Sequence, residues 1–165
     1  MSNCSHENQC CHTLGSCSQT LDELEFERGI WQAAIDGDII KIKKLLNKNV
    51  NVNVTDSSGY TALHYAARNG HCDTVEFLIQ QGACVNCQTK FGKDTPLHRA
   101  AYIGNEKIVE LLLENSADAM LQNTDGHTCL HKAAQKGHQV IVEILMCKYP
   151  SLVNIIDNKG RKPTE

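Results

Sequence analysis

Aromatic residues, prolines and long apolar runs are all scarce in this sequence. Aromatics make up 5% of the 165 residues, and there are 3 prolines. No apolar run approaches the roughly 18 residues that span a bilayer, and the first residues lack the apolar stretch of a secretory signal. Lys and Arg are not clustered as on nucleic-acid-binding surfaces, and the formal net charge is −3. We therefore expect a soluble cytosolic or nuclear protein that binds neither nucleic acid nor membrane.

Cysteine, by contrast, is abundant, and its number is odd. A secreted disulfide scaffold normally has an even number of cysteines in a short, loop-rich chain. In a reducing compartment most cysteines are free thiols, with metal binding as the exception. We expect that state for the nine cysteines: Cys4, Cys10, Cys11, Cys17, Cys72, Cys84, Cys87, Cys129 and Cys147.

The strongest pattern is a repeat of about 33 residues. Three copies contain the tetrads TALH (61–64), TPLH (95–98) and TCLH (128–131), each followed by an Ala pair and then a glycine. An earlier, degenerate copy has Trp31 where the others have histidine. Units of this length cannot bury their apolar faces alone, so they stack into a solenoid once three or more are present. The marking glycines are Gly37, Gly70, Gly104 and Gly137.

Each copy predicts two helices joined by a tight turn. The threonine of the tetrad suits a helix start, because its side chain can accept an unpaired backbone N–H. The glycine suits the helix end, where a left-handed backbone is common. A second helix follows with apolar residues at i, i+3 and i+4, as in Val109, Leu112 and Leu113. That spacing is typical of an amphipathic helix.

These tetrads, Ala pairs and glycine ends resemble the ankyrin repeat family over residues 28–158. The resemblance implies an all-α solenoid of stacked helix–loop–helix pairs with hairpin-like fingers. We assign the repeats to 28–57, 58–91, 92–124 and 125–158. Residues 20–27 are predicted to form a capping helix, residues 1–19 a disordered Cys/His-rich tail, and residues 159–165 the start of a degenerate or truncated fifth repeat.

The same resemblance assigns structural roles to several recurring residues. The tetrad histidines would form hydrogen bonds within and between repeats. They cannot share a metal, because stacked helices lie about 8–10 Å apart and two zinc ligands at most about 4 Å apart. The large Trp31 suggests a first repeat that caps the stack. The residues with predicted structural roles are His64, His98, His131, Gly70, Gly104, Gly137 and Trp31.

The C-terminal end departs from the pattern. Lys162, Pro163 and Thr164 stand where the next tetrad is expected. The last stacked face would therefore lack a cover, and we predict that Ile141 and Ile144 are more exposed than their equivalents in the preceding repeats.

Two cysteine motifs raise the question of metal. Cys84-x-x-Cys87 has the spacing of a metal or redox pair, but no second pair accompanies it at metal-site spacing. The N-terminal segment contains more residues of the types that bind zinc. Their spacing matches no standard zinc finger. The alternative is a tail with free thiols. Zinc is the one cofactor considered, with candidate ligands Cys4, Cys10, Cys11, His12 and Cys17.

No catalytic motif is present: there is no Gly-rich phosphate loop, Gly-x-Ser-x-Gly elbow or His-Glu-x-x-His pair. We expect a monomeric, non-catalytic adaptor. The resemblance implies that it binds a protein partner through the concave side, made of finger tips and exposed first-helix positions. A zinc-dependent function of the N-terminal segment, with the repeats selecting the target, is the alternative. The candidate partner-binding residues are Tyr60, Arg68, Asn69, Phe91, Asp94, Tyr102, Ile103, His127, Gln135 and Lys136.

A modification is also implied. In many ankyrin proteins an oxygenase hydroxylates an asparagine of the finger. Asn53 and Asn86 stand eight residues after Leu45 and Leu78 in that pattern. The alternative is that asparagine simply suits the turn.

Overall fold

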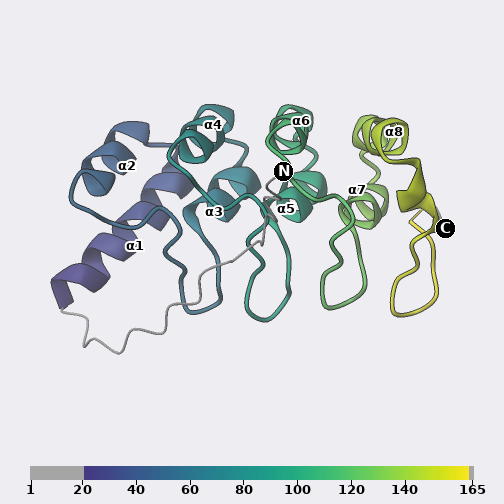
Figure 1. The fold of residues 1–165 in the computed structure, drawn as a ribbon, viewed down its shortest axis with the longest axis horizontal. Coiled ribbons are helices and arrows are strands. Elements are labelled where there is room, and N and C mark those ends of the chain that lie inside the picture. Colours follow the sequence, from purple (N-terminus) through teal and green to yellow (C-terminus); the bar gives the residue numbers. More distant parts are fainter. Residues whose placement is uncertain (1–20, 164–165) are drawn as a thin grey trace, which may run out of the picture.

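The computed structural model describes the backbone of residues 21–163 and the side chains of residues 29–163. Four helix pairs lie side by side in a row, and a loop connects each pair to the next (Figure 1). The pairs are α1 (Leu21–Asp36) with α2 (Ile39–Leu46), α3 (Ala62–Asn69) with α4 (Cys72–Gln80), α5 (Pro96–Ile103) with α6 (Glu106–Glu114), and α7 (Cys129–Lys136) with α8 (Gln139–Lys148), followed by the short 3₁₀ helix η1 (Pro150–Asn154).

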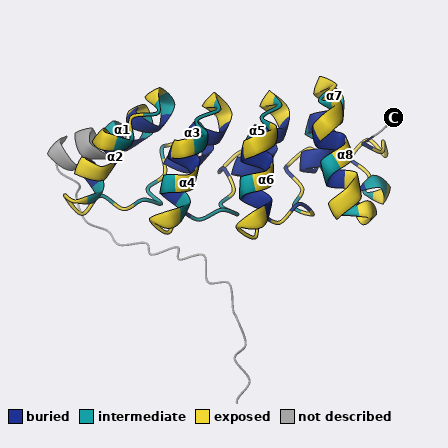
Figure 2. Ribbon diagram, turned by 90° about the horizontal axis from the view of Figure 1, so that it is seen from above, coloured by how far each residue is buried: buried dark blue, intermediate teal, exposed yellow. Residues whose placement is uncertain are grey.

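The helices form two layers. The first helices, α1, α3, α5 and α7, pack on one another and make the inner layer, whereas α2, α4, α6 and α8 make the outer layer (Figures 1 and 2). The connecting loops, which we call fingers, project from the inner layer on the side away from the outer helices. This arrangement confirms the predicted all-α solenoid. Within residues 21–163, none of the helices combines the length and apolarity that crossing a bilayer requires.

The inner helices begin and end as their sequences predict. Thr95 has an extended backbone, and its hydroxyl accepts the backbone N–H of His98 at 3.4 Å. Pro96 follows at the first helical position, where its missing N–H costs no hydrogen bond. Gly104 ends the helix with a left-handed φ of 91°. Corresponding threonine and glycine residues bound α3 and α7.

Small residues allow the inner helices to approach closely. Ala66, Ala67, Ala100 and Ala101 are completely buried where α3 and α5 pack against their neighbours. The apolar stripe of each outer helix faces this layer, so that buried residues lie between the two layers along the whole row (Figure 2). One continuous core therefore runs through all four repeats.

The capping helix predicted for residues 20–27 is the first part of α1, which continues through Gly29 to Asp36. A single glycine in a helix costs only about 1 kcal/mol relative to alanine, so it does not end the helix. A Cβ at Gly29 would lie 3.5 Å from the side chain of Leu45. This is ordinary van der Waals contact, so an alanine would also fit between α1 and α2.

The prediction of exposed Ile141 and Ile144 is wrong. Ile141 is completely buried, like Ile108 in the preceding repeat, and Ile144 is half-buried. Ile141 belongs to the common core as Ile108 does, and η1 packs on α8 with Leu152 in that same core. The exposed end face lies elsewhere: Met146 is 37% exposed, whereas its equivalent Leu113 is 8% exposed.

Successive fingers are aligned by backbone hydrogen bonds. The N–H of Lys90 donates to the carbonyl of Ser58 at 2.9 Å, and the next two pairs of fingers repeat this contact. Gly59 lies beside this bond with φ of 83°, and a Cβ there would come within 2.4 Å of the Lys90 nitrogen. A side chain at position 59 would therefore force the Lys90 backbone to move. In the next finger the equivalent residue is Lys93, which makes the turn there with a left-handed φ of 51°.

Because of this close approach, we expect two glycine substitutions at the same left-handed φ to differ in their effect on stability. Gly82 also has φ of 83°, but a Cβ there would meet nothing within 4 Å. Gly82→Ala should therefore lower the free energy of unfolding by about 1 kcal/mol, the cost of a left-handed alanine. Gly59→Ala should cost about 1–3 kcal/mol more, because backbone must move. Urea unfolding of both variants checks this, and equal losses would show that the fingers separate without penalty.

Candidate functional site

Three pairs of residues at the ends of inner helices form one exposed row. Each pair directly precedes the glycine that ends its helix. Tyr102 and Ile103 on α5 are 37% and 44% exposed, although both are largely apolar. Because α5 packs between α3 and α7, these two residues occupy the middle of the row. The row consists of Arg68, Asn69, Tyr102, Ile103, Gln135 and Lys136, all candidates from the sequence.

In the middle of the row, the charge of Lys136 interacts with the ring of Tyr102. The Lys136 Nζ lies over the Tyr102 ring, 4.4 Å from its centre. Such a cation–aromatic contact is favourable because the ring face is electron-rich. The same lysine lowers the pKa of Tyr102. An aromatic ring and a positive charge are thus presented together to solvent.

A second row, which the sequence analysis missed, lies one turn earlier on the same helices. It consists of Tyr65, Arg99 and Lys132, each directly after a tetrad histidine. The Tyr65 hydroxyl donates to Asp56 Oδ2 at 2.7 Å, and burial together with this bond raises the pKa of Tyr65 to about 12. The available signal was helical spacing, because these residues stand three positions before the exposed pairs.

The finger residues divide into exposed and internal ones. Phe91 is 70% exposed, and the Lys90 Nζ lies 5.5 Å from its ring centre. Tyr60 is half-buried under the Arg99 guanidinium, which lies over its ring at 5.1 Å and hydrogen-bonds its hydroxyl. Phe91 can contact a partner directly, whereas Tyr60 mainly supports Arg99.

Asp94 and His127 were predicted to be exposed binding residues, and the structure corrects both. Asp94 is buried; its Oδ1 accepts the Asn123 amide at 2.9 Å and its Oδ2 pairs with Arg99 at 2.9 Å. The His127 side chain is 14% exposed, and its Nε2 lies 3.3 Å from Asp157 Oδ2. Both residues precede the first-helix threonine, where the finger turns back into the stack.

The tetrad histidines connect each inner helix to the next finger. The Nδ1 of His64 accepts the backbone N–H of Thr61 at 3.2 Å, so its Nε2 carries the proton and donates to the Asp94 carbonyl at 3.0 Å. His98 contacts the His127 carbonyl at 2.9 Å in the same way, and His131 the Arg161 carbonyl at 3.4 Å. Burial lowers the pKa of His64 to about 4 and also lowers the pKa values of His98 and His131.

Trp31 occupies the histidine position in the first repeat and makes a similar outward contact. Its indole Nε1 donates to the Val54 carbonyl at 3.1 Å. The substitution therefore keeps a hydrogen bond from the inner helix to the following finger. The larger ring packs against the core at the first end of the row.

The two candidate hydroxylation sites connect neighbouring repeats. The Asn53 amide oxygen accepts the Cys84 backbone N–H at 2.7 Å, and its Nδ2 donates to the Gly82 carbonyl at 3.2 Å. Asn86 makes the equivalent pair of bonds with Asp118 and Ser116. Hydroxylation of either residue stays a prediction. The geometry supplies a structural reason for asparagine, because both ends of the amide are used.

The metal predictions fall mostly outside the described residues. Cys4, Cys10, Cys11, His12 and Cys17 belong to that part, so zinc binding there stays a prediction. Among residues whose side chains are described, no three His, Cys, Asp or Glu side chains lie close enough together to hold a metal ion. Cys84 and Cys87 are both half-buried.

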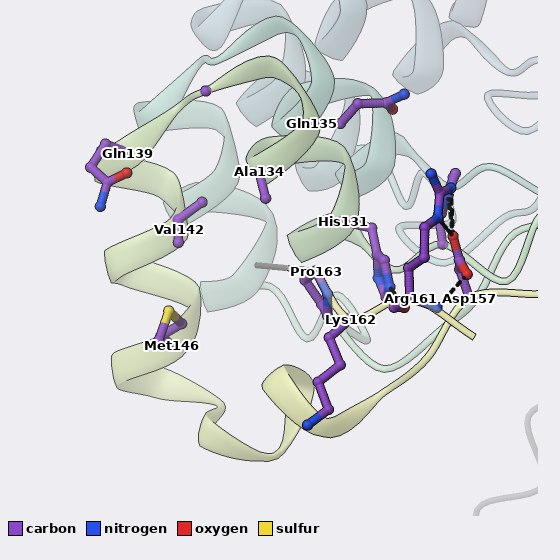
Figure 3. A pocket seen from close by; sticks show the side chains of 12 residues that line it. His131, Ala134, Gln135, Gln139, Val142, Met146, Asp157, Arg161, Lys162 and Pro163 are labelled. Atoms are coloured by element: carbon purple, nitrogen blue, oxygen red, sulfur yellow. Dashed lines mark hydrogen bonds and ion pairs between the residues drawn. The ribbon is translucent and has the colours of Figure 1, made fainter. Parts of the chain in front are cut away.

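A hollow of about 680 Å³ lies at the exposed end face, over α7 and α8 (Figure 3). Its walls combine apolar residues of the helices, such as Val142 and Met146, with the last finger. In that finger, Arg161 pairs with Asp157 at 2.7 Å, and hydrogen bonds from the Arg161 backbone and guanidinium lower the pKa of Asp157. Ala134 is half-buried there, whereas Ala67 and Ala101 are fully buried.

Comparison with known proteins identifies the repeat. A family model described as ankyrin repeats (3 copies) matches residues 4–89 and 84–157. Ankyrin repeat domain-containing protein 39 from Homo sapiens is 49% identical over 86 residues, covering 52% of this chain and 45% of that protein. Its counterpart from Bos taurus is 53% identical over 68 residues, covering 41% and 35%. The chain thus spans less than half the length of either relative.

A more distant relative aligns over a longer stretch. The probable 26S proteasome regulatory subunit p28 from Saccharomyces cerevisiae is 34% identical over 129 residues, which are 76% of this chain and 56% of that protein.

The neutral histidines make stability depend on pH. In the unfolded chain, His64 has the ordinary histidine pKa of 6.5, whereas in the folded protein burial lowers its pKa to about 4. Stability should therefore fall as pH decreases from about 6.5 to 4.5, with His64 alone contributing on the order of 2 kcal/mol. Urea unfolding at pH 7.5, 6.5, 5.5 and 4.5 measures this. In His64→Asn, the drop should be smaller; an unchanged drop would contradict the assignment.

The internal position of Asp94 predicts a stability effect. Asp94→Ala leaves the Arg99 guanidinium and the Asn123 amide without this partner, so unfolding free energy should fall by about 1–3 kcal/mol. The matched control is Asp125→Ala, on the exposed part of the next finger, which should change stability by less than about 0.5 kcal/mol. Thermal and urea unfolding measure the stability of both variants. Equal losses of unfolding free energy would contradict the internal role of Asp94.

Proposed function

Because this chain belongs to the ankyrin-repeat family, we propose that it is a non-catalytic adaptor that binds a protein partner through its inner helices and fingers. Ankyrin repeats are generally protein–protein interaction modules without catalytic activity. We call the proposed site the inner surface; it comprises the exposed row, the second row and the exposed finger residues. A repeat scaffold presents such a surface as one extended face.

The observation that carries the proposal is the exposed centre of the row. Tyr102 and Ile103 are adjacent, largely apolar and open to solvent, and they lie between Arg68 on α3 and Lys136 on α7. Tyrosine and arginine are enriched among residues that dominate binding energy. An apolar centre with a polar rim is the usual anatomy of a protein interface.

The surface is also held in one shape before any partner binds. The histidine bonds tie each finger to the preceding inner helix, and Asp94 fixes Arg99. Preorganised surfaces lose little conformational entropy on association. This rigidity supports binding of an exposed segment from a partner over chemistry on a small molecule.

Site-specific photo-crosslinking tests the location. A photo-reactive amino acid at position 102 should capture a protein partner, whereas the same group at Lys107 on outer helix α6 should not. Tyr102→Ala should weaken binding of the captured partner at least tenfold, as expected for a central residue. Its unfolding midpoint should match the parent chain, because the side chain is exposed. Capture from position 107 alone would place the interface on the outer layer and refute the proposal.

A further inference from the structure

In the last three repeats, charge is segregated between the two helix layers. The first repeat differs, because outer helix α2 carries Lys41, Lys43 and Lys44 and inner helix α1 ends in Asp36. The inner helices α3, α5 and α7, all fully described, contain basic residues and no carboxylate. The outer helices α4, α6 and α8 carry mainly carboxylates, accompanied by Lys107 and Lys148. The inner set is Arg68, Arg99, Lys132 and Lys136, and the outer carboxylates are Asp73, Glu76, Glu106, Glu110, Glu114 and Glu143.

Several finger carboxylates do not offset this positive charge because they are engaged internally. Asp56 accepts the Tyr65 hydroxyl and the backbone N–H groups of residues 58 and 60. Asp94 is buried against Arg99, and Asp157 against Arg161. Lys90 and Lys93 remain exposed, with Asp125 as an exposed carboxylate on the next finger. Over α3, α5, α7 and their fingers the surface is therefore predominantly basic, whereas Asp36 adds an exposed carboxylate at the end of α1. The whole chain has a net charge of −3.

The positive charges lie beside exposed apolar groups. Lys136 lies over Tyr102, and Lys90 lies over Phe91. A carboxylate that reaches either ammonium group would lie next to an aromatic ring. An apolar side chain of the same segment could then pack on the ring or on Ile103. The two kinds of contact favour acidic and apolar residues in one ligand.

We propose that the partner segment is an acidic peptide, with carboxylates flanking an apolar or aromatic centre. The inference rests on the proposed function of the inner surface. Neighbouring helices lie about 8–10 Å apart, so α3 and α7 are separated by two such steps, roughly 16–20 Å. The Lys136 Nζ reaches back over Tyr102 on α5, which brings it closer to Arg68 than the helix axes are. Since an extended chain rises about 3.3 Å per residue, the two flanking carboxylates would be at most about five or six residues apart.

A nucleic acid fits the same surface less well. A phosphate backbone needs a closely spaced row of cations, but here Tyr102 and Ile103 separate Arg68 from Lys136. Of the four inner basic residues, Arg99 is already paired with Asp94. The mixture of apolar and basic groups favours a peptide.

Selection from a random 12-residue display library on the full chain tests the inference. The selected peptides should be more acidic than the input by at least two charges and should contain an apolar or aromatic residue between carboxylates. Replacing their glutamates by glutamine should weaken binding at least tenfold, and raising NaCl from 50 to 300 mM should weaken it further. Neutral or basic peptides, or no enrichment, would overturn the proposal.

Matched charge reversals locate the site. Arg68→Glu and Lys136→Glu should each weaken binding of the selected peptides at least tenfold. Lys107→Glu and Lys148→Glu, the same change on the outer layer, should alter it less than twofold. All four variants should remain folded because all four side chains are exposed. The unfolding midpoints of Arg68→Glu, Lys136→Glu and Lys148→Glu should fall by about 2–4 °C, because these residues lie in the last turns of their helices, where positive charge is favourable.

The outcomes also separate this inference from the proposed function. Neutral peptides that are lost in Arg68→Glu would refute the acidic preference but keep the inner surface as a binding site. Peptides lost only in Lys107→Glu would refute both. Tighter binding of a 12-nucleotide single-stranded DNA than of the best peptide would assign the basic charge to nucleic acid instead.

Discussion

The hydrogen bond from a buried histidine to the carbonyl of the following finger connects one repeat to the next. In His64 the ring accepts an N–H of its own helix start and donates to the Asp94 carbonyl, so a single side chain positions both elements. Accepting the Thr61 N–H at Nδ1 requires a neutral ring, which burial favours by lowering the pKa of His64. In the first repeat the Trp31 indole also donates to the following finger, but to the Val54 carbonyl, seven residues before the helix threonine.

This bond also determines which finger residues remain available to a partner. The carbonyl that accepts it belongs to the residue before the helix threonine, and the acceptor residue is drawn against the stack. Asp94 and His127 occupy that position and turn inward, where they pair with Arg99 and Asp157. Phe91, near the tip of the same finger as Asp94, stays exposed. The inner surface of the last three repeats consequently gains its positive character, because Asp56, Asp94 and Asp157 are engaged internally whereas Lys90 and Lys93 are exposed.

The two end faces of the stack are covered by different structures. Stacked units need their outermost faces covered, because an apolar face left in water costs burial energy. At the first end, α1 is longer than the other inner helices, and its Trp31 packs against the core. At the other end η1 covers part of α8, and the last finger follows, yet Ala134 and Met146 remain more exposed than their equivalents. The hollow of Figure 3 lies over this incompletely covered face.

The sequence alone determined the helix pairs, their order and their ends, because Thr, Ala and Gly act through local backbone chemistry that recurs every 33 residues or so. It also indicated Tyr102, Ile103, Arg68 and Lys136 as exposed residues of the inner helices. Only the tertiary structure decided that Asp94 is buried, since its partner Asn123 comes from another segment of the chain. The segregation of charge into two layers over the last three repeats likewise depends on which helices share a face, and packing determines that.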